Sequence, residues 1–251
     1  MIRSETAERI ARIRFDRLDK KNAITAEMYA QLGRALAAAD ADRNVRALLL
    51  HGSEDCFTSG NDVGDFLKRS ATDASPAFAL FETLPKLEKP IVAAVGGPAV
   101  GIGSTLLLHC DLVYAADNAR FQLPFVPLGI VPEFGSTFLL PLIAGYQRAA
   151  ELLLLGQPFN AQKAYEAGIV TAVVSKDELL SRALEGAKAL AALPPESMRL
   201  TKKLMKARHG EPLAAAIAEE TRLFRERLTS PEAKEAMSAF LEKRKPDFSR
   251  F

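Results

Sequence analysis

The stretch KPIVAAVGGPAVGIGSTLLLHCD, residues 89–111, decides the fold class of this chain of 251 residues. Lys89-Pro90 interrupts a helical pattern, and the β-branched run Ile91–Val95 that follows is typical of a buried strand. Gly96-Gly97-Pro98 ends that strand. Residues 101–110 are apolar with helical spacing. The sequence therefore predicts a strand, a glycine-rich turn and then a helix.

Strands and helices alternate on both sides of this stretch. The apolar patterns predict strands over 9–15, 46–51, 112–115 and 169–174, and helices over 25–40, with Thr25 as the N-cap, 75–87, 134–143 and 148–155. From residue 176 onward the pattern is helical only, with amphipathic segments over 195–208, 212–228 and 231–245. We therefore expect an α/β core over residues 1–193 and a helical region over residues 194–251, divided at Leu193-Pro194-Pro195.

Composition excludes several classes of protein. The formal net charge is +2, and basic residues alternate with acids, as in Arg225-Glu226-Arg227, so we expect no nucleic-acid partner. No apolar run reaches the roughly 18 residues that span a bilayer, and the first residues lack an apolar signal core. Neither the two cysteines nor the three histidines have metal-ligand spacing, so we expect no metal. A cytoplasmic protein in a reducing compartment follows by elimination.

Two glycine-containing loops could bind a ligand through their backbone. The first, Ser59-Gly60-Asn61-Asp62, follows a predicted buried strand; it is either a plain strand–helix connection, with Asp62 as a helix cap, or a loop whose N–H groups face a ligand. The second, residues 97–104, opens a helix. Gly101 and Gly103 would let a ligand approach the free N–H groups of that helix N-terminus, which suits an oxygen that becomes anionic during a reaction.

Other interpretations of the second loop fit less well. A dinucleotide fingerprint requires a third glycine or alanine where Leu106 stands, and a Gly-x-Ser-x-Gly nucleophile elbow is absent.

Glu133 is the acid that stands out in the middle of the chain. It lies in Val131-Pro132-Glu133-Phe134-Gly135, and no other acid occurs between Asp117 and Glu151. Apolar neighbours would desolvate its carboxylate, raise its pKa and make it a better base. A helix-N-terminal glutamate that complements the helix dipole is the other interpretation, and local sequence does not choose between them.

Together these segments resemble the crotonase (enoyl-CoA hydratase/isomerase) superfamily nearly from end to end. The resemblance rests on residues 17–23, 57–63, 89–111, 161–170 and 240–248, in the order in which the family's motifs occur. It implies a spiral of ββα units followed by a helical trimerisation region, and a homotrimer or hexamer. It also implies an acyl-CoA substrate, and no separate cofactor, since CoA is part of the substrate.

The same resemblance assigns roles to residues. The two oxyanion-hole N–H groups fall on Asn61 and Ile102, and substrate-binding positions fall on Ser59, Gly60, Asp62, Gly101, Gly103 and Phe125. Lys243 would lie near the nucleotide phosphates and Phe224 near the pantetheine or adenine. A neighbouring subunit could supply both residues. The acyl pocket would be lined by the loop from Phe66 to Phe78.

Two departures from the family pattern bear on the reaction. Hydratases of the family carry two glutamates that activate water, and the corresponding positions here hold Thr105 and Phe125. Pro132-Glu133-Phe134-Gly135-Ser136 instead resembles the peroxisomal-type Δ3,Δ2-enoyl-CoA isomerases, which carry their single catalytic glutamate at this position. The resemblance thus favours isomerisation in fatty acid metabolism. Hydration or other acyl-CoA chemistry is the alternative, and a silent acyl-CoA- or RNA-binding scaffold is an alternative of another class.

Overall fold

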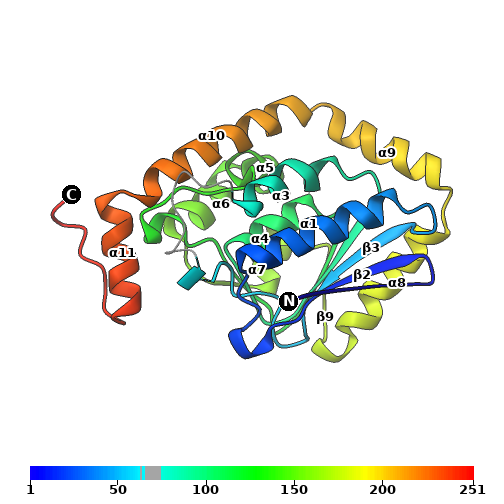
Figure 1. Cartoon of the computed structure of the whole chain (residues 1–251), viewed down its shortest axis with the longest axis horizontal. Coiled ribbons are helices and arrows are strands. Elements are labelled where there is room, and N and C mark those ends of the chain that lie inside the picture. The colour runs from blue at the N-terminus through cyan, green and yellow to red at the C-terminus, as the bar shows by residue number, and fades with distance from the viewer. Residues whose placement is uncertain (63, 66–74) are drawn as a thin grey trace.

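The computed structural model describes residues 1–62, 64–65 and 75–251 (Figure 1). Most of the segment expected to line an acyl pocket, residues 66–74, therefore lies outside the described residues. Among the described residues, no helix is long and apolar enough to cross a membrane.

The central sheet has the strand order β1-β2-β3-β4-β6-β9. β1 pairs with β2 in antiparallel fashion, and the remaining neighbours are parallel. The strands span β1 (Ile2–Ala7), β2 (Ile10–Phe15), β3 (Ala47–His51), β4 (Ile91–Val95), β6 (Leu112–Ala116) and β9 (Ala172–Val174).

Helices cover both faces of this sheet. Leu48 and Leu50 of β3 belong to the larger apolar core, which includes Leu32 of α1 (Ala26–Ala41) and Leu80 of α3 (Pro76–Thr83). Leu49, between them, points to the opposite face and packs in a second cluster with α8 (Leu179–Ala192). Buried residues on both faces explain why the inner strands have apolar runs rather than an alternating pattern.

A second, smaller sheet crosses the ends of the central strands. It has the order β5-β7-β8, formed by β5 (Pro98–Val100), β7 (Arg120–Gln122) and β8 (Phe159–Asn160). β4 continues directly into β5, and β6 into β7, so each successive pair gives one strand to each sheet. The short helix α4 (Ile102–Thr105) and a 3₁₀ turn (Leu106–His109) follow β5. This repetition is the ββα spiral that the family resemblance implies.

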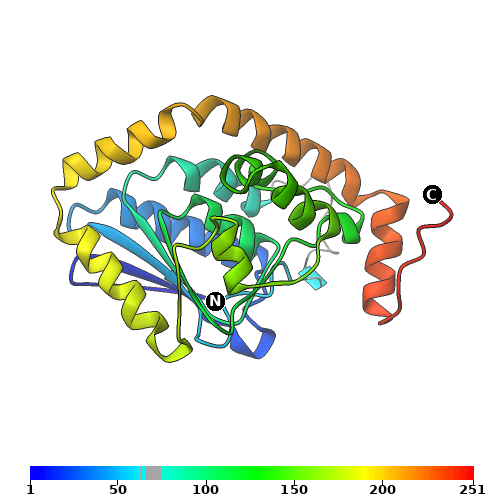
Figure 2. The ribbon, with the colours of Figure 1, turned by 180° about the vertical axis from the view of Figure 1, so that it is seen from behind.

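The C-terminal helices form an arch over the core. In Figures 1 and 2, α9 (Pro195–Ala207) and α10 (Gly210–Leu228) run across the side that carries α1, α3 and α5, and α11 (Pro231–Leu241) turns down at one end. The chain thus ends in a helical region, as the fold class predicted, while the domain boundary at residues 193 and 194 stays a prediction.

Several boundaries differ from the sequence prediction. The helix expected over 134–143 is α5 (Ser136–Ala144), because Phe134 and Gly135 have left-handed φ values of 63° and 72°. The helix expected over 148–155 divides into α6 (Tyr146–Ala150) and a π-helical turn (Glu151–Leu155). The helix α7 (Ala161–Glu166) lies between this turn and β9. β9 itself is shorter than the strand predicted over 169–174.

Candidate active site

The two glycine-containing loops lie side by side at the ends of β3 and β4. Thr58 N–H donates to the carbonyl oxygen of Pro98 at 2.9 Å, and Val100 N–H donates to the carbonyl oxygen of Thr58 at 3.1 Å. Gly60 adopts a φ of 90°, and a Cβ there would lie 2.8 Å from the Val100 carbonyl oxygen. The close approach of the loops therefore requires glycine at this position.

The backbone directs two N–H groups of these loops away from their neighbours. Ile24 N–H donates to Gly60 O at 2.8 Å, and Asp62 N–H donates to Ile24 O at 3.0 Å. Asn61, between Gly60 and Asp62, thus turns its own N–H to the opposite side of the loop, as in a parallel ladder. Ile102 is the first residue of α4, where an N–H has no intrahelical acceptor. Both N–H groups are available to an oxygen ligand.

Residues near the N-terminus support the first loop. Arg17 bonds the Asp62 carboxylate at 2.7 Å and the Ala23 carbonyl oxygen at 2.9 Å, and its hydrogen bond to Asp62 holds the pKa of that carboxyl below its usual value. The buried Asn22 side chain donates to the carbonyl oxygens of Cys56 and Phe57 at 3.1 and 3.0 Å. These contacts give the family-like segment 17–23 a physical role that sequence reasoning left unassigned.

A cavity of about 340 Å³ opens beside both loops. Its wall includes the expected oxyanion-hole residues Asn61 and Ile102 and the expected substrate-binding residues Ser59, Gly60, Gly101, Phe125 and Phe224. Phe224 comes from α10 of the same chain, together with Met237 and Phe240 of α11. Among the expected substrate-binding residues, Asp62, Gly103 and Lys243 do not line it: Asp62 is held by Arg17, and Gly103 packs against Thr58.

Glu133 is buried close to this cavity but is not part of its wall. Ile130 lines the cavity, and Glu133 follows three residues later with only 3% of its surface exposed. Its Oε1 atom has no hydrogen-bond partner among the described residues. Burial first, and the nearby Glu220 carboxyl second, raise the pKa of Glu133 to about 8. Such a carboxyl holds its proton weakly enough near neutral pH to exchange it with a substrate.

An aromatic stack fixes the residue after Glu133. The Phe134 ring stacks on Phe81 and on His109, with ring centroids 4.4 and 4.0 Å apart, and the His109 Nε2 atom lies 2.8 Å from the Phe134 carbonyl oxygen. Burial lowers the pKa of His109 to about 4, so the ring is neutral and donates to that carbonyl. His109 is therefore an uncharged residue packed in the core.

A larger cavity of about 660 Å³ lies beyond this stack. Phe81 and His109 line it, together with Phe78 of α3 and Leu213 and Ile217 of α10. In the chain, Glu133 therefore lies between Ile130, which lines the smaller cavity, and Phe134, which stacks on Phe81 in the wall of the larger cavity.

Thr105 occupies the position where hydratases of the resembled family carry their first glutamate. It lies one helical turn beyond Ile102, so both residues share a face of α4. Its side chain is fully buried, and its Oγ1 atom has no hydrogen-bond partner among the described residues. Thr105 and Glu133 thus each have a buried side-chain oxygen without a hydrogen-bond partner among the described residues.

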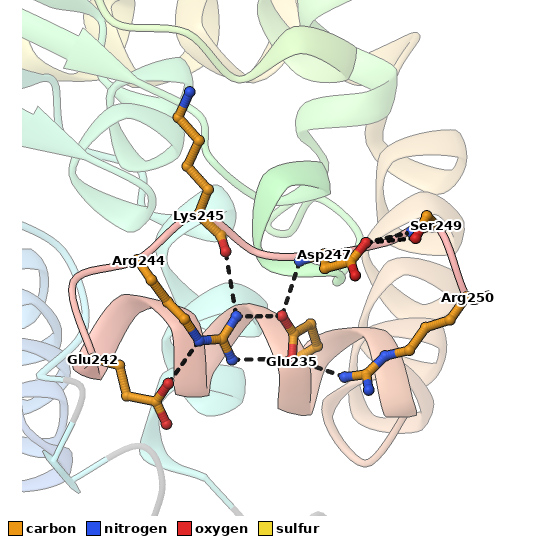
Figure 3. A network of polar contacts seen from close by, with 7 residues as sticks. All are labelled: Glu235, Glu242, Arg244, Lys245, Asp247, Ser249 and Arg250. Carbon is orange, nitrogen blue, oxygen red and sulfur yellow. Dashed lines mark hydrogen bonds and ion pairs between the residues drawn. The ribbon is translucent and has the colours of Figure 1, made fainter.

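The segment that carries Lys243 is tied down by an ion-pair network (Figure 3). The Glu235 carboxylate of α11 accepts from Arg244 at 2.5 Å, from Arg250 at 3.0 Å and from the Asp247 N–H at 2.9 Å. The hydrogen bond from Arg244 comes first among the causes that lower the pKa of Glu235 to about 2. Lys243 is exposed, has a φ of 55° and does not line the cavity. Its expected contact with CoA phosphates stays a prediction.

Two relatives resemble the chain along most of its length. It is 38% identical over 244 residues to enoyl-CoA delta isomerase 2 of Rattus norvegicus, and the match covers 94% of this chain and 62% of the rat protein. It is 34% identical to a probable enoyl-CoA hydratase of Rhizobium meliloti, covering 97% of this chain and 96% of that protein. The chain therefore spans less than two thirds of the rat relative, but nearly all of the bacterial one.

A solved structure and a family model agree with these relatives. The fold superposes on the crystal structure of an enoyl-CoA hydratase/isomerase from Pseudoalteromonas atlantica T6c with a TM-score of 0.94 and 39% identity, covering 99% of both chains. The family model described as enoyl-CoA hydratase/isomerase matches residues 5–250. With paired glycine loops, two outward N–H groups and this match over nearly its whole length, the chain belongs to the enoyl-CoA hydratase/isomerase (crotonase) family of acyl-CoA enzymes.

Proposed function

We propose that the protein isomerises 3-enoyl-CoA to trans-2-enoyl-CoA, with Glu133 as the single acid–base residue. The observation that carries the proposal is one buried carboxyl with an unpartnered oxygen, in a chain that has Thr105 and Phe125 where hydratases of the family hold their two glutamates. A hydratase needs groups that bind and activate water, whereas an isomerase needs one base that accepts a proton and returns it.

The steps follow from the proposed positions of the reacting groups. The thioester oxygen accepts hydrogen bonds from the N–H groups of Asn61 and Ile102. Glu133 removes a proton from C2, the C2–H electrons form a C2=C1 double bond, and the thioester oxygen becomes an oxyanion. The N–H pair stabilises this dienolate, a contribution of about 10²- to 10³-fold in rate for one donor. Protonated Glu133 then returns the proton to C4: the C3=C4 electrons form the C4–H bond, the C1=C2 electrons form the C2=C3 double bond, and the oxyanion re-forms the thioester carbonyl.

The substrate must extend beyond the smaller cavity to reach the base. CoA would enter along the wall formed by Phe224 and Phe240, with the thioester beside the two loops. The acyl chain would then pass Glu133 toward the larger cavity between α3 and α10. This route leaves room for an acyl tail longer than that of a four-carbon substrate, since about 660 Å³ lies beyond the Phe81–Phe134 stack.

Hydration is the second candidate, favoured by the name of the Rhizobium meliloti relative. In that case, Glu133 would activate water together with a residue elsewhere in the site, because positions 105 and 125 hold no glutamate.

A deuterium-transfer experiment tests the proposed reaction. 3-Hexenoyl-CoA carrying two deuterium atoms at C2 is incubated with the purified protein, and the 2-hexenoyl-CoA product is analysed by NMR and mass spectrometry. A single buried base predicts deuterium at C4 of a large share of the product, and loss of turnover by about 10²-fold or more in Glu133→Gln. Unchanged turnover in Glu133→Gln contradicts the assignment of the base.

A further inference from the structure

Glu220 of α10 holds the backbone immediately after Glu133. Its Oε2 atom accepts from the Gly135 N–H at 2.5 Å, and its Oε1 atom accepts from the Thr137 N–H at 2.8 Å and from the Thr137 hydroxyl at 2.5 Å. The first of these bonds joins residues 85 positions apart. A residue of the helical C-terminal region thus anchors the loop that carries the proposed base.

The anchored backbone is one that the chain does not adopt readily. Phe134 has a φ of 63°, which is uncommon for a residue with a side chain, and Gly135 follows with 72°. A Cβ at Gly135 would lie 2.4 Å from the Leu213 side chain, so α10 packs tightly against this turn. The N–H groups of Gly135 and Thr137, which have no intrahelical acceptor at the start of α5, bind Glu220 instead. Three bonds to one carboxylate therefore fix where Glu133 lies.

Glu220 also places a charge beside Glu133. Its side chain is buried, and no salt bridge to it occurs among the described residues. All three of its bonds come from donors at a helix N-terminus, which favours the ionised form, although burial raises the pKa of Glu220 overall. After burial, the Glu220 carboxyl is the second cause that raises the pKa of Glu133, and His109, whose own pKa burial lowers, is neutral. Lys206 of α9 acts on His109, and Arg225 of α10 stacks over Phe78.

We propose that Glu220 is a positioning residue whose hydrogen bonds to Gly135 and Thr137 fix the location of the Glu133 carboxyl, with the Glu220 carboxyl held near it. This role rests on the proposed function, in which Glu133 takes a proton from C2 and must release it again at C4. Without the neighbouring charge, Glu133 would be a stronger acid, and hence a weaker base toward a C–H group. The geometry thus makes α10 part of the catalytic apparatus and not only a cover over the core.

The first test titrates Glu133 without substrate. The carboxyl C=O infrared band is followed against pH in the wild type and in Glu220→Gln, with the matching Glu133→Gln spectra subtracted to isolate the Glu133 signal. We expect the Glu133 midpoint to move to lower pH in Glu220→Gln, because a like charge has gone. Glu219→Gln is the matched control, since Glu219 is the next residue of α10 and pairs with Arg222 on the surface; it should leave the midpoint in place. An unchanged midpoint in Glu220→Gln overturns the inference.

The second test measures turnover. In Glu220→Gln, the acid limb of kcat/KM should move to lower pH in step with the infrared midpoint, and kcat should fall by about tenfold or more because the base is less well placed. If the wild type does not isomerise 3-enoyl-CoA at all, the proposed function fails, while the infrared titration still decides whether Glu220 acts on Glu133.

A second pair of variants covers the case in which Glu220→Gln does not fold. Thr137→Val removes the hydroxyl that donates to Glu220, whereas Thr137→Ser keeps it. We expect kcat to fall severalfold in Thr137→Val with little change in KM, and to be largely retained in Thr137→Ser. Equal kcat values in Thr137→Val and the wild type overturn the positioning role.

Discussion

The stability of Glu133→Gln relative to the wild type should rise as the pH rises. Burial raises the pKa of this carboxyl from 4.5 to about 8. The unfolded chain releases the proton above about pH 4.5 while the folded chain keeps it, so folding takes up a proton between these two pH values. A group with a raised folded pKa gives stability at low pH that is lost as the pH rises through the folded pKa. The wild type thus loses stability over this window, and Glu133→Gln, which cannot ionise, does not.

The size of this effect follows from the pKa difference. At about 1.36 kcal/mol for each pH unit, the wild type should lose about 3 kcal/mol relative to Glu133→Gln between pH 5 and pH 7.5. Urea unfolding of both proteins at a fixed protein concentration, repeated at several pH values, measures this difference. Glu219→Gln removes the same charge from an exposed position and should follow the wild type.

Parallel stability curves for the wild type and Glu133→Gln from pH 5 to pH 7.5 would contradict a raised pKa of Glu133. They would mean that Glu133 ionises as it does in the unfolded chain, and that its burial does not hold the proton.

Further expectations concern the loops and the tail. Gly60→Ala should lower kcat by tenfold or more with the fold retained, because the added Cβ meets the Val100 carbonyl at 2.8 Å and displaces the Asn61 N–H; circular dichroism and kinetics check this. Asn22→Ala should cost about 1–3 kcal/mol in urea unfolding, because the carbonyl oxygens of Cys56 and Phe57 each lose a hydrogen bond from a buried side chain. Ala214→Phe, in the larger cavity, should reduce kcat/KM for trans-3-decenoyl-CoA more than for trans-3-hexenoyl-CoA. Glu235→Gln should speed hydrogen exchange in residues 242–251 at pH 7, and wild-type protection there should fall as the pH drops toward 2.

Local signals in the sequence predicted much of the fold. Thr25 caps α1 by accepting from the Met28 N–H, and α9 begins at Pro195, each at the predicted residue. β1 was missed because its residues are mostly exposed on both faces, which leaves no apolar alternation to detect. The strands of the small sheet are two or three residues long and give no periodic signal of their own.

Only part of the site was predicted, mainly because some of its contacts join residues that lie far apart in the sequence. Motif positions pointed to Asn61, Ile102 and Glu133, and the roles of these residues stay predictions. The left-handed turn at Phe134 was not foreseen, because a phenylalanine at positive φ has no sequence signature. Glu220 was not foreseen either, since nothing local marks one glutamate among the acids of α10 as the residue that bonds Gly135, 85 positions away.

The most direct test of the account compares two substrates at pH 8.5, where Glu133 is largely ionised. Purified protein is given trans-3-hexenoyl-CoA and, separately, crotonyl-CoA, and the products are separated by liquid chromatography. We expect rapid formation of trans-2-hexenoyl-CoA. From crotonyl-CoA, 3-hydroxybutyryl-CoA should form at least about 10²-fold more slowly, because no second glutamate holds water. Rapid hydration of crotonyl-CoA with little migration of the hexenoyl double bond would contradict it.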